Sequence, residues 1–335
     1  MDRRGFLLLV GVASCSRCHS DHPKHQTTPQ PPRPAGPHEI TVEDFEREIW
    51  SAGPGATYVP TTAAEREMLQ KLIPKLLEGS RAQPPPDPQA WRAEANAVDF
   101  DIAIWKVYGE TFWGLIEAPG KVRGAGAYIF RVAPKETGAT VLLEAPHNFF
   151  DLGTGRIAAE LFFRPQTGNK PRALFTNTIH RYQLSPGNKK KRKDHPADVA
   201  HNPEHAYSYA TEAFATAAGG CRVIQIHGFG ERDDVTGARI TAIEVVVSGG
   251  EPQAPTQASR QVSGSLAKDF GNGVKRFPDE TQYLGATTNV QKKLLANIPN
   301  SEFVHVELSA DLRDRLQKSA EARAMLARSL FDPAP

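Results

Sequence analysis

Four side chains that could bind a metal or act in acid–base catalysis follow apolar segments in the second half of the chain. They are His147, His180, His227 and Glu307. The apolar segments before them are predicted to be strands, and in an open α/β sheet ligands bind beyond the carboxyl ends of the strands. A catalytic zinc site uses about three His, Asp or Glu ligands and leaves one position for water. We therefore expect a catalytic metal site at this edge of the sheet.

The elements that would position these side chains are predicted by alternating helical and strand periodicity after residue 140. Strands are expected at 140–145, 173–176, 222–226, 239–247 and 301–308. Helices are expected at 154–163, 203–218, 255–270 and 310–329. This order is typical of an α/β fold with a mixed, mostly parallel sheet flanked by helices. Strands at 98–105, 111–116 and 127–132 are expected to extend one side of that sheet.

The catalytic domain is predicted to span residues 97–330, after a helical N-terminal extension at 40–96. Within that extension, Thr62-Ala-Ala-Glu65 has the spacing of a capping box at the start of a helix. With 39% hydrophobic and 23% charged residues, the composition is that of an ordinary globular protein.

Several motifs in the catalytic domain resemble those of the phosphorylase/hydrolase-like zinc enzymes. They are Leu142-Leu-Glu-Ala-Pro-His147, Asp151-Leu-Gly-Thr154, Ile226-His227-Gly228 and Val306-Glu307-Leu-Ser309, followed by Leu312-Arg313. That superfamily includes zinc carboxypeptidases, N-formylglutamate amidohydrolases and poly-γ-glutamate hydrolases. The resemblance covers residues 141–316 and lies in the order of the motifs. It implies a zinc-dependent amidohydrolase or peptidase in which His147, Asp151 and His227 bind the metal and Glu307 is the general base.

The sequence departs from the carboxypeptidase pattern at the acidic ligand. That pattern is H-x-x-E, whereas Asp151 stands one residue further from His147 and is the shorter acid. Asp151 is the expected third ligand, and because of this departure His180 and His201 are alternatives to it. Asp151 could instead be the N-cap of the helix predicted at 154–163.

Other polar residues are candidates for binding the substrate or stabilising charge on it. Arg181 is assigned a catalytic role as a cation for the oxyanion, or it could grip a substrate carboxylate, and Arg260 is a second candidate for these roles. His180 and His201 are expected on the substrate side. Asn289 could hydrogen-bond the substrate, although an N-cap of the following helix is the alternative.

The N-terminus is predicted to direct export and lipid anchoring. Two arginines precede a short apolar segment, and Val12-Ala-Ser-Cys15 resembles a bacterial lipobox. We expect a twin-arginine-like signal peptide at 1–14, lipidation of Cys15 and a Pro-rich tether at 15–39. Ser16 favours the outer membrane over the inner. The alternative is haem attachment at Cys15-Ser-Arg-Cys18-His19, but the following segment lacks the apolar periodicity of a haem pocket.

The charge balance limits the expected partners. The formal net charge of +2 gives no reason to expect nucleic acid, and the basic residues 189–193 are expected to be a solvated loop. The expected substrate is a small peptide or an acidic glutamyl or cell-wall polymer. The alternative to an enzyme is a non-catalytic binding lipoprotein of the cell envelope that keeps the hydrolase fold.

Overall fold

The computed structural model describes residues 33–34, 36–136, 138–165, 167–183, 195–230 and 243–333. The signal peptide, Cys15 and the basic residues 189–193 lie outside these residues. The helices are α1 (Val42–Trp50), α2 (Ala63–Arg81), α3 (Arg92–Asn96), α4 (Thr154–Phe163), α5 (Ala206–Ala218), α6 (Gln257–Phe270), α7 (Val290–Leu295), α8 (Ala310–Lys318) and α9 (Ala320–Phe331). Short 3-10 turns are η1 (Gly53–Gly55), η2 (Pro88–Trp91) and η3 (Gly271–Gly273).

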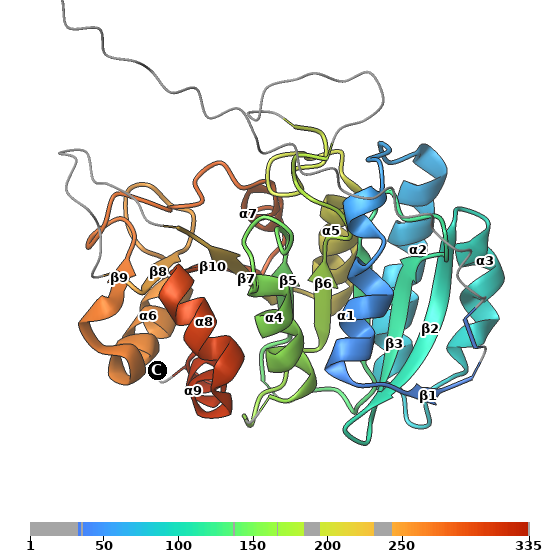
Figure 1. Cartoon of the computed structure of the whole chain (residues 1–335), viewed down its shortest axis with the longest axis horizontal. Coiled ribbons are helices and arrows are strands. Elements are labelled where there is room, and N and C mark those ends of the chain that lie inside the picture. Colours follow the sequence, from blue (N-terminus) through green and yellow to red (C-terminus); the bar gives the residue numbers. More distant parts are fainter. Residues whose placement is uncertain are drawn as a thin grey trace, which may run out of the picture.

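The strands form one mixed sheet between two layers of helices (Figure 1). They are β1 (His38–Glu39), β2 (Phe100–Val107), β3 (Glu110–Glu117), β4 (Ala127–Arg131), β5 (Val141–Ala145), β6 (Ala173–Thr176), β7 (Arg222–Gly228), β8 (Val245–Ser248), β9 (Val274–Arg276) and β10 (Glu302–Leu308). Their order is β1-β2-β3-β4-β6-β5-β7-β10-β8-β9, and the central strands β6, β5, β7 and β10 are mutually parallel. The predicted α/β fold is confirmed, including the extension by β2, β3 and β4.

Alternate residues of the central strands supply two hydrophobic cores, one on each face of the sheet. Leu143, Ile224 and Val304 pack on the face covered by α1, α4, α6, α8 and α9. Leu142 and Val223 pack on the opposite face, against α2 and α5. The central strands are therefore buried on both faces, as parallel strands generally are.

Residues 40–96, predicted as a helical extension, pack on the same sheet as the rest of the chain. Val42 and Phe45 of α1 enter one core, and Leu72 of α2 enters the other. The predicted capping box at Thr62 and Glu65 is confirmed. The last two residues of the predicted tether, His38 and Glu39, pair with β2 as β1.

Several predicted boundaries are wrong for local reasons. The single helix expected at 310–329 is two helices, because Ser319 leaves helical geometry and caps α9. The helix expected from residue 203 begins at Ala206, where His205 is the N-cap. Of the strand expected at 239–247, residues 243 and 244 are described and lie outside a strand, and β8 begins at Val245. No helix among the described residues is long and apolar enough to cross a membrane.

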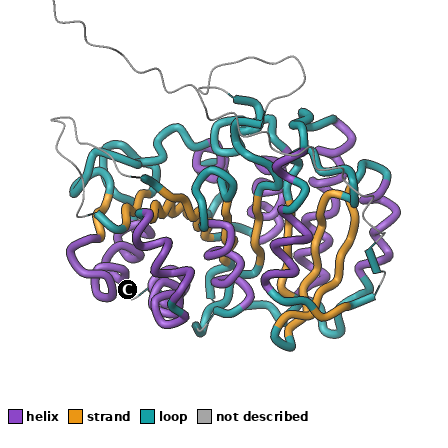
Figure 2. Tube along the Cα trace, viewed as in Figure 1, coloured by secondary structure: helices purple, strands orange, loops and turns teal. Residues whose placement is uncertain are grey.

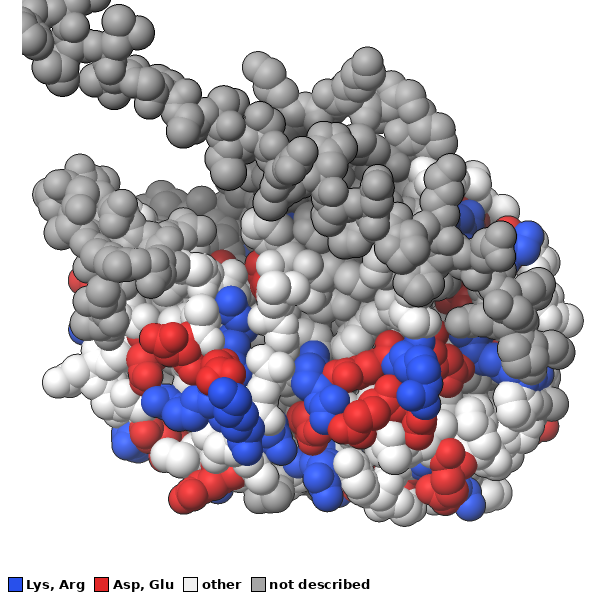
Figure 3. Space-filling view, in the orientation of Figure 1, with Lys and Arg blue, Asp and Glu red and all other residues white. Residues whose placement is uncertain are grey.

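Loops gather along one edge of the sheet, the upper edge in Figure 2. On the face shown in Figure 3, basic and acidic side chains are interspersed over the lower half of the described surface. Arg156 of α4 pairs with Glu43 and Glu46 of α1, and Arg315 pairs with Glu244. The charges visible on this face therefore compensate each other.

A buried carboxyl group lies in the middle of the sheet. Glu144 of β5 is fully buried; Oε1 accepts a hydrogen bond from the Thr211 hydroxyl (2.6 Å) and Oε2 one from Gln225 Nε2 (2.7 Å). Burial raises the pKa of Glu144 from 4.5 to about 7, although both hydrogen bonds oppose the shift. The folded protein thus binds this proton more tightly than the unfolded chain, and stability should fall as pH rises from 4.5 to 7.

We predict that Glu144→Gln stabilises the metal-free protein at pH 8 by roughly 2–3 kcal/mol and changes stability little at pH 5. A glutamine mimics the protonated acid, since its Nε2 can donate to Thr211 while its oxygen still accepts from Gln225. The measurement is urea unfolding at both pH values with a chelator present. Glu212→Gln, an exposed change on α5, is the control. An equal effect of Glu144→Gln at both pH values would contradict the assignment.

Candidate metal centre

The central strands change from apolar to polar toward their carboxyl ends. On the face toward α5 and α7, Val223 of β7 is followed at two-residue intervals by Gln225 and His227. On β10, His305 and Glu307 lie beside Gln225 and His227 in the parallel register. Residues in register on parallel strands point to the same face, so strand alternation alone brings these polar side chains together.

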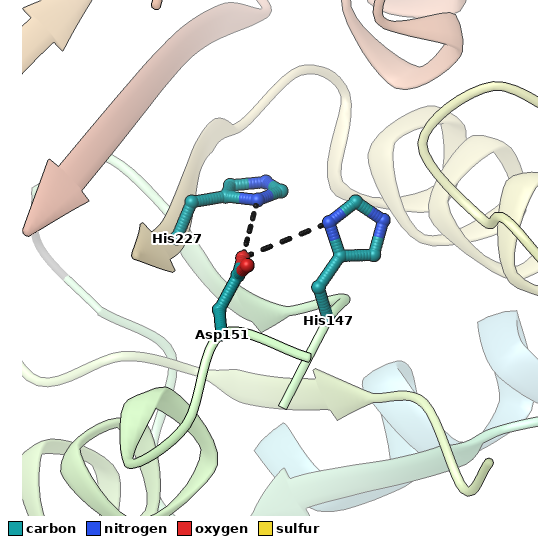
Figure 4. Close-up of side chains that lie close together, drawn as sticks. All are labelled: His147, Asp151 and His227. Carbon is teal, nitrogen blue, oxygen red and sulfur yellow. Dashed lines mark hydrogen bonds and ion pairs between the residues drawn. The ribbon is translucent and has the colours of Figure 1, made fainter. Parts of the chain in front are cut away.

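Three side chains converge where β5 and β7 end (Figure 4). His147 and His227 both direct Nδ1 toward the carboxylate of Asp151. Asp151 Oδ2 lies 3.2 Å from His227 Nδ1 and 3.7 Å from His147 Nδ1. All three side chains are buried. Tetrahedral ligands at about 2.0–2.2 Å from one zinc ion lie roughly 3.3–3.6 Å apart, and both distances from Asp151 Oδ2 are close to this range.

The outer nitrogens of both imidazoles contact acceptor oxygens. His147 Nε2 lies 2.9 Å from Asp198 Oδ1, and His227 Nε2 lies 3.3 Å from Gln225 Oε1. Histidines that bind metals usually donate the other ring N–H to a carboxylate or carbonyl oxygen, which fixes the orientation of the ring. The surroundings of both histidines therefore fit metal ligation through Nδ1.

A tight turn accommodates the extra residue between His147 and Asp151. The backbone N–H groups of Phe150 and Asp151 both donate to the His147 carbonyl, each at 2.8 Å. The N-cap of α4 is Gly153, which has a φ of 88° and no side chain to cap the helix. The alternative that Asp151 caps this helix is therefore wrong, and its carboxylate is directed to the two imidazoles instead.

Burial and hydrogen bonding shift the pKa values of all three groups. Burial lowers the pKa of His227 to about 4, against the effect of Asp151. Burial also lowers the pKa of His147, but contacts with Asp151 and Asp198 outweigh it, and the net shift is upward. Burial alone would raise the pKa of Asp151. Hydrogen bonds with both histidines outweigh burial and hold this pKa well below its usual range. The cluster therefore presents a buried carboxylate beside a neutral His227.

Glu307 and His305 extend the cluster along β10. The His305 ring lies 4.4 Å from the His227 ring, and His305 Nε2 lies 3.7 Å from Glu307 Oε1. His227, His305 and Glu307 could themselves hold a cation, because one ligand atom of each lies within 4.8 Å of the others. Glu307 thus lies next to the candidate metal site, where a general base would be needed.

A pocket of about 220 Å³ opens over this cluster. It is lined by His147, Arg181, Ala200, His201, His227, Leu284, Ala286, Thr287, Thr288, Asn289, His305 and Glu307. One wall comes from the segment before α5 and the other from the segment before α7. His201 joins the two walls, because its Nε2 lies 3.2 Å from Thr288 Oγ1.

Asp198 organises the side chains of the first wall. Its carboxylate accepts hydrogen bonds from Nε and Nη2 of Arg181, in addition to the bond with His147. His201 Nδ1 lies 3.2 Å from the same carboxylate. Arg181 Nη1 also lies 3.1 Å from His147 Nδ1, which places the guanidinium beside the candidate metal ligands.

Among the predicted site residues, the structure brings His147, Asp151, His227, Glu307, Arg181, His201 and Asn289 to this pocket or its floor. His180 and Arg260 do not line it. The His180 ring packs beside Phe150 and Tyr182, so this residue is not placed as the alternative third ligand. Arg260 is exposed on α6, and its Nε donates to the Pro255 carbonyl.

Sequence reasoning assigned no role to Asp198, Gln225 or His305. A signal was present for Gln225, because a glutamine within a buried apolar strand requires hydrogen-bond partners. His305 carried the same signal on β10. Asp198 lies in a loop, and nothing in its local sequence indicates that its carboxylate reaches His147, which is 51 residues earlier.

No protein-family model matches the chain, and no curated protein matches it in sequence. Solved structures with a similar fold include N-formylglutamate amidohydrolase from Ralstonia eutropha JMP134 (12% identity, 59% of this chain and 92% of that one, TM-score 0.32). Another is succinylglutamate desuccinalase from Vibrio parahaemolyticus (10% identity, 72% of this chain and 80% of that one, TM-score 0.41). A third is a metallo-carboxypeptidase from Burkholderia cenocepacia (12% identity, 71% of this chain and 78% of that one, TM-score 0.35).

We predict that the protein binds about one zinc ion per chain and that His147→Ala and His227→Ala each lose it, since each change removes one of three ligands. Metal content after dialysis, measured by atomic spectrometry, is the test. His180→Ala is the matched control and should retain the metal. Stoichiometric zinc in the His147→Ala and His227→Ala proteins would place the metal elsewhere.

Proposed function

We propose that this protein is a zinc-dependent hydrolase of an amide bond. The observation that carries the proposal is the convergence of two imidazole Nδ1 atoms and a buried carboxylate beneath a pocket that also contains Glu307. A zinc ion held by His147, Asp151 and His227 would supply Lewis acidity, making a water molecule acidic near neutral pH and polarising a carbonyl oxygen.

Glu307 is proposed to move the proton. Its carboxylate lines the pocket beside His227, within reach of a water molecule over the metal ligands. As a general base it would take a proton from the attacking water and return it to the nitrogen of the leaving amine. The water oxygen would add to the carbonyl carbon, and the C–N bond of this adduct would then break, giving a carboxylic acid and an amine.

Arg181 is proposed to stabilise negative charge on the substrate. Asp198 engages two of its five N–H donors, and a third points at His147 Nδ1 and would be released when that nitrogen binds the metal. The remaining donors and the positive charge would favour an oxyanion or a substrate carboxylate in the pocket. His201 and Asn289 line the same pocket and are the proposed substrate contacts. A small pocket with Arg181 in its wall suits a short peptide or an acidic glutamyl or cell-wall polymer.

We predict that Glu307→Gln retains zinc but lowers kcat/KM about 10²–10⁴-fold, because an amide cannot accept the proton. The measurement is hydrolysis of a panel of γ-glutamyl and peptidoglycan amides, with metal content determined in parallel. Glu302→Gln, at the opposite end of β10, is the control and should keep full activity.

An active Glu307→Gln protein would remove Glu307 from the mechanism. If the wild-type protein retained zinc and hydrolysed none of the amides, the hydrolase proposal would fail, and a binding lipoprotein with this fold would be favoured.

We also propose that the mature protein is exported and lipid-anchored through Cys15 in the cell envelope, with the outer membrane favoured. The support is the sequence at residues 1–16.

We predict that Cys15→Ser moves the protein from the membrane fraction to the soluble fraction and abolishes labelling with a radioactive fatty acid, since the acylated sulfur is lost. Cys18→Ser is the control. A mature protein with a haem absorption band would contradict this proposal.

A further inference from the structure

Gln225 lies two residues before the candidate metal ligand His227, on the same face of β7. Its side-chain amide uses its full hydrogen-bonding capacity. Its side-chain oxygen accepts from Asn289 Nδ2 (2.8 Å) and faces His227 Nε2 (3.3 Å). Its amide nitrogen donates to Glu144 Oε2 (2.7 Å) and to Gln291 Oε1 (3.3 Å). A glutamine amide has two donor hydrogens and two acceptor lone pairs, so each has a partner here. The side chain is completely buried.

The helix α7 determines which way this amide points. Asn289 is the N-cap of α7, and its oxygen accepts the backbone N–H of Lys292 at 3.1 Å. With the oxygen engaged in that cap, the Asn289 NH2 group must face Gln225. Only the oxygen of Gln225 can accept from it, so the cap fixes the amide of Gln225 with its oxygen toward Asn289 and His227.

Gln291 fixes the same orientation independently. Its amide nitrogen donates to the Val199 carbonyl (2.9 Å) and lies 3.1 Å from the Ser208 hydroxyl, so its oxygen faces Gln225. That oxygen requires a donor, which the NH2 group of Gln225 supplies. Reversing the amide of Gln225 would place two NH2 groups together at Asn289 and two oxygens together at both Gln291 and Glu144.

His227 therefore faces an acceptor at Nε2 whose orientation cannot reverse. A proton on Nε2 makes a hydrogen bond to Gln225, whereas a proton on Nδ1 would leave the Nε2 lone pair against the oxygen of Gln225. The carboxylate of Asp151, 3.2 Å from Nδ1, favours that second tautomer in the absence of a metal. A metal can bind only the unprotonated nitrogen, so the competition between these two acceptors bears on metal affinity.

We propose that Gln225 is a positioning residue that stabilises the tautomer of His227 protonated at Nε2, which is the form whose Nδ1 can bind a metal. The orientation of Gln225 is determined by the N-cap of α7 and by Gln291. Its consequence for metal affinity rests on the proposed zinc site, whereas its effect on the fraction of His227 protonated at Nε2 can be measured in the metal-free protein.

The test compares two substitutions at residue 225. Gln225→Met removes the acceptor that faces His227 Nε2. Of the two hydrogen-bond contacts described for His227, the one with Asp151 at Nδ1 then remains. We expect the fraction of His227 protonated at Nε2 in the metal-free protein to fall and the zinc affinity to fall about 10–100-fold. Gln225→Glu keeps an oxygen toward His227, and its second oxygen can share a proton with Glu144. It should retain the wild-type tautomer and bind zinc more tightly than the methionine variant.

The tautomer is measured by long-range proton–nitrogen NMR on metal-free protein labelled with ¹⁵N-histidine, and His227→Ala assigns the signal. Zinc affinity is measured by competition with a chelator, and thermal unfolding of the metal-free proteins reports stability. Gln261→Met is the matched control, because that glutamine contacts Arg222 at the other end of β7. It should leave both the tautomer and the zinc affinity unchanged.

A fraction of His227 protonated at Nε2 that does not change in Gln225→Met would overturn the inference. Equal losses of zinc affinity in the methionine and glutamate variants would also overturn it, because they would reveal a packing role. These results are separate from the proposed function, since a tautomer shift in Gln225→Met in a protein that binds no zinc contradicts only the latter.

Discussion

The buried carboxylate of Asp151 imposes the central constraint on this structure. An ionised carboxylate removed from water costs several kcal/mol unless opposite charge and hydrogen bonds compensate it. Its immediate partners are His147 and His227, and burial keeps His227 neutral at physiological pH. Full compensation therefore requires a nearby cation, which could be a protonated His147, the Arg181 guanidinium beside it or a metal ion. The arrangement is costly as a purely structural feature, which is a physical reason to regard it as a binding site.

The sheet places these groups with little freedom. The β5–β7–β10 register sets Glu144 beside Gln225 and Glu307 beside His227. Arg313 of α8 then ties the following loops together, because its guanidinium donates to the carbonyls of Leu152, Phe229 and Leu308. A single buried side chain thus connects the loops that follow Asp151, His227 and Glu307. Such rigidity is what a catalytic site needs, since small displacements of ligands reduce activity.

Two hydrogen-bonded groups support the candidate metal ligands from different parts of the chain. Asp198 holds His147, Arg181 and His201 on one side of the pocket. Gln225 contacts Nε2 of His227 and is itself hydrogen-bonded to side chains at the start of α7. Both supports are buried, where hydrogen bonds are strong and unpaired groups are costly. The pocket walls and the ligands are therefore coupled through these networks.

The sequence by itself determined the fold class and most of the candidate site. Alternating periodicities predicted the sheet and its flanking helices, and strand-end positions predicted His147, His227 and Glu307, because parallel strands bring their carboxyl ends to one edge. Helix boundaries near Ser319 and Ala206 escaped prediction, since they depend on caps and backbone angles rather than on periodicity.

Tertiary structure alone decided the role of Asp151, the exclusion of His180 and Arg260 from the pocket, and the supporting roles of Asp198 and Gln225. These depend on where a loop turns and on contacts between segments tens of residues apart. Local sequence patterns carry no information about such distances, because they reflect which face of an element is buried and not which remote side chain meets it.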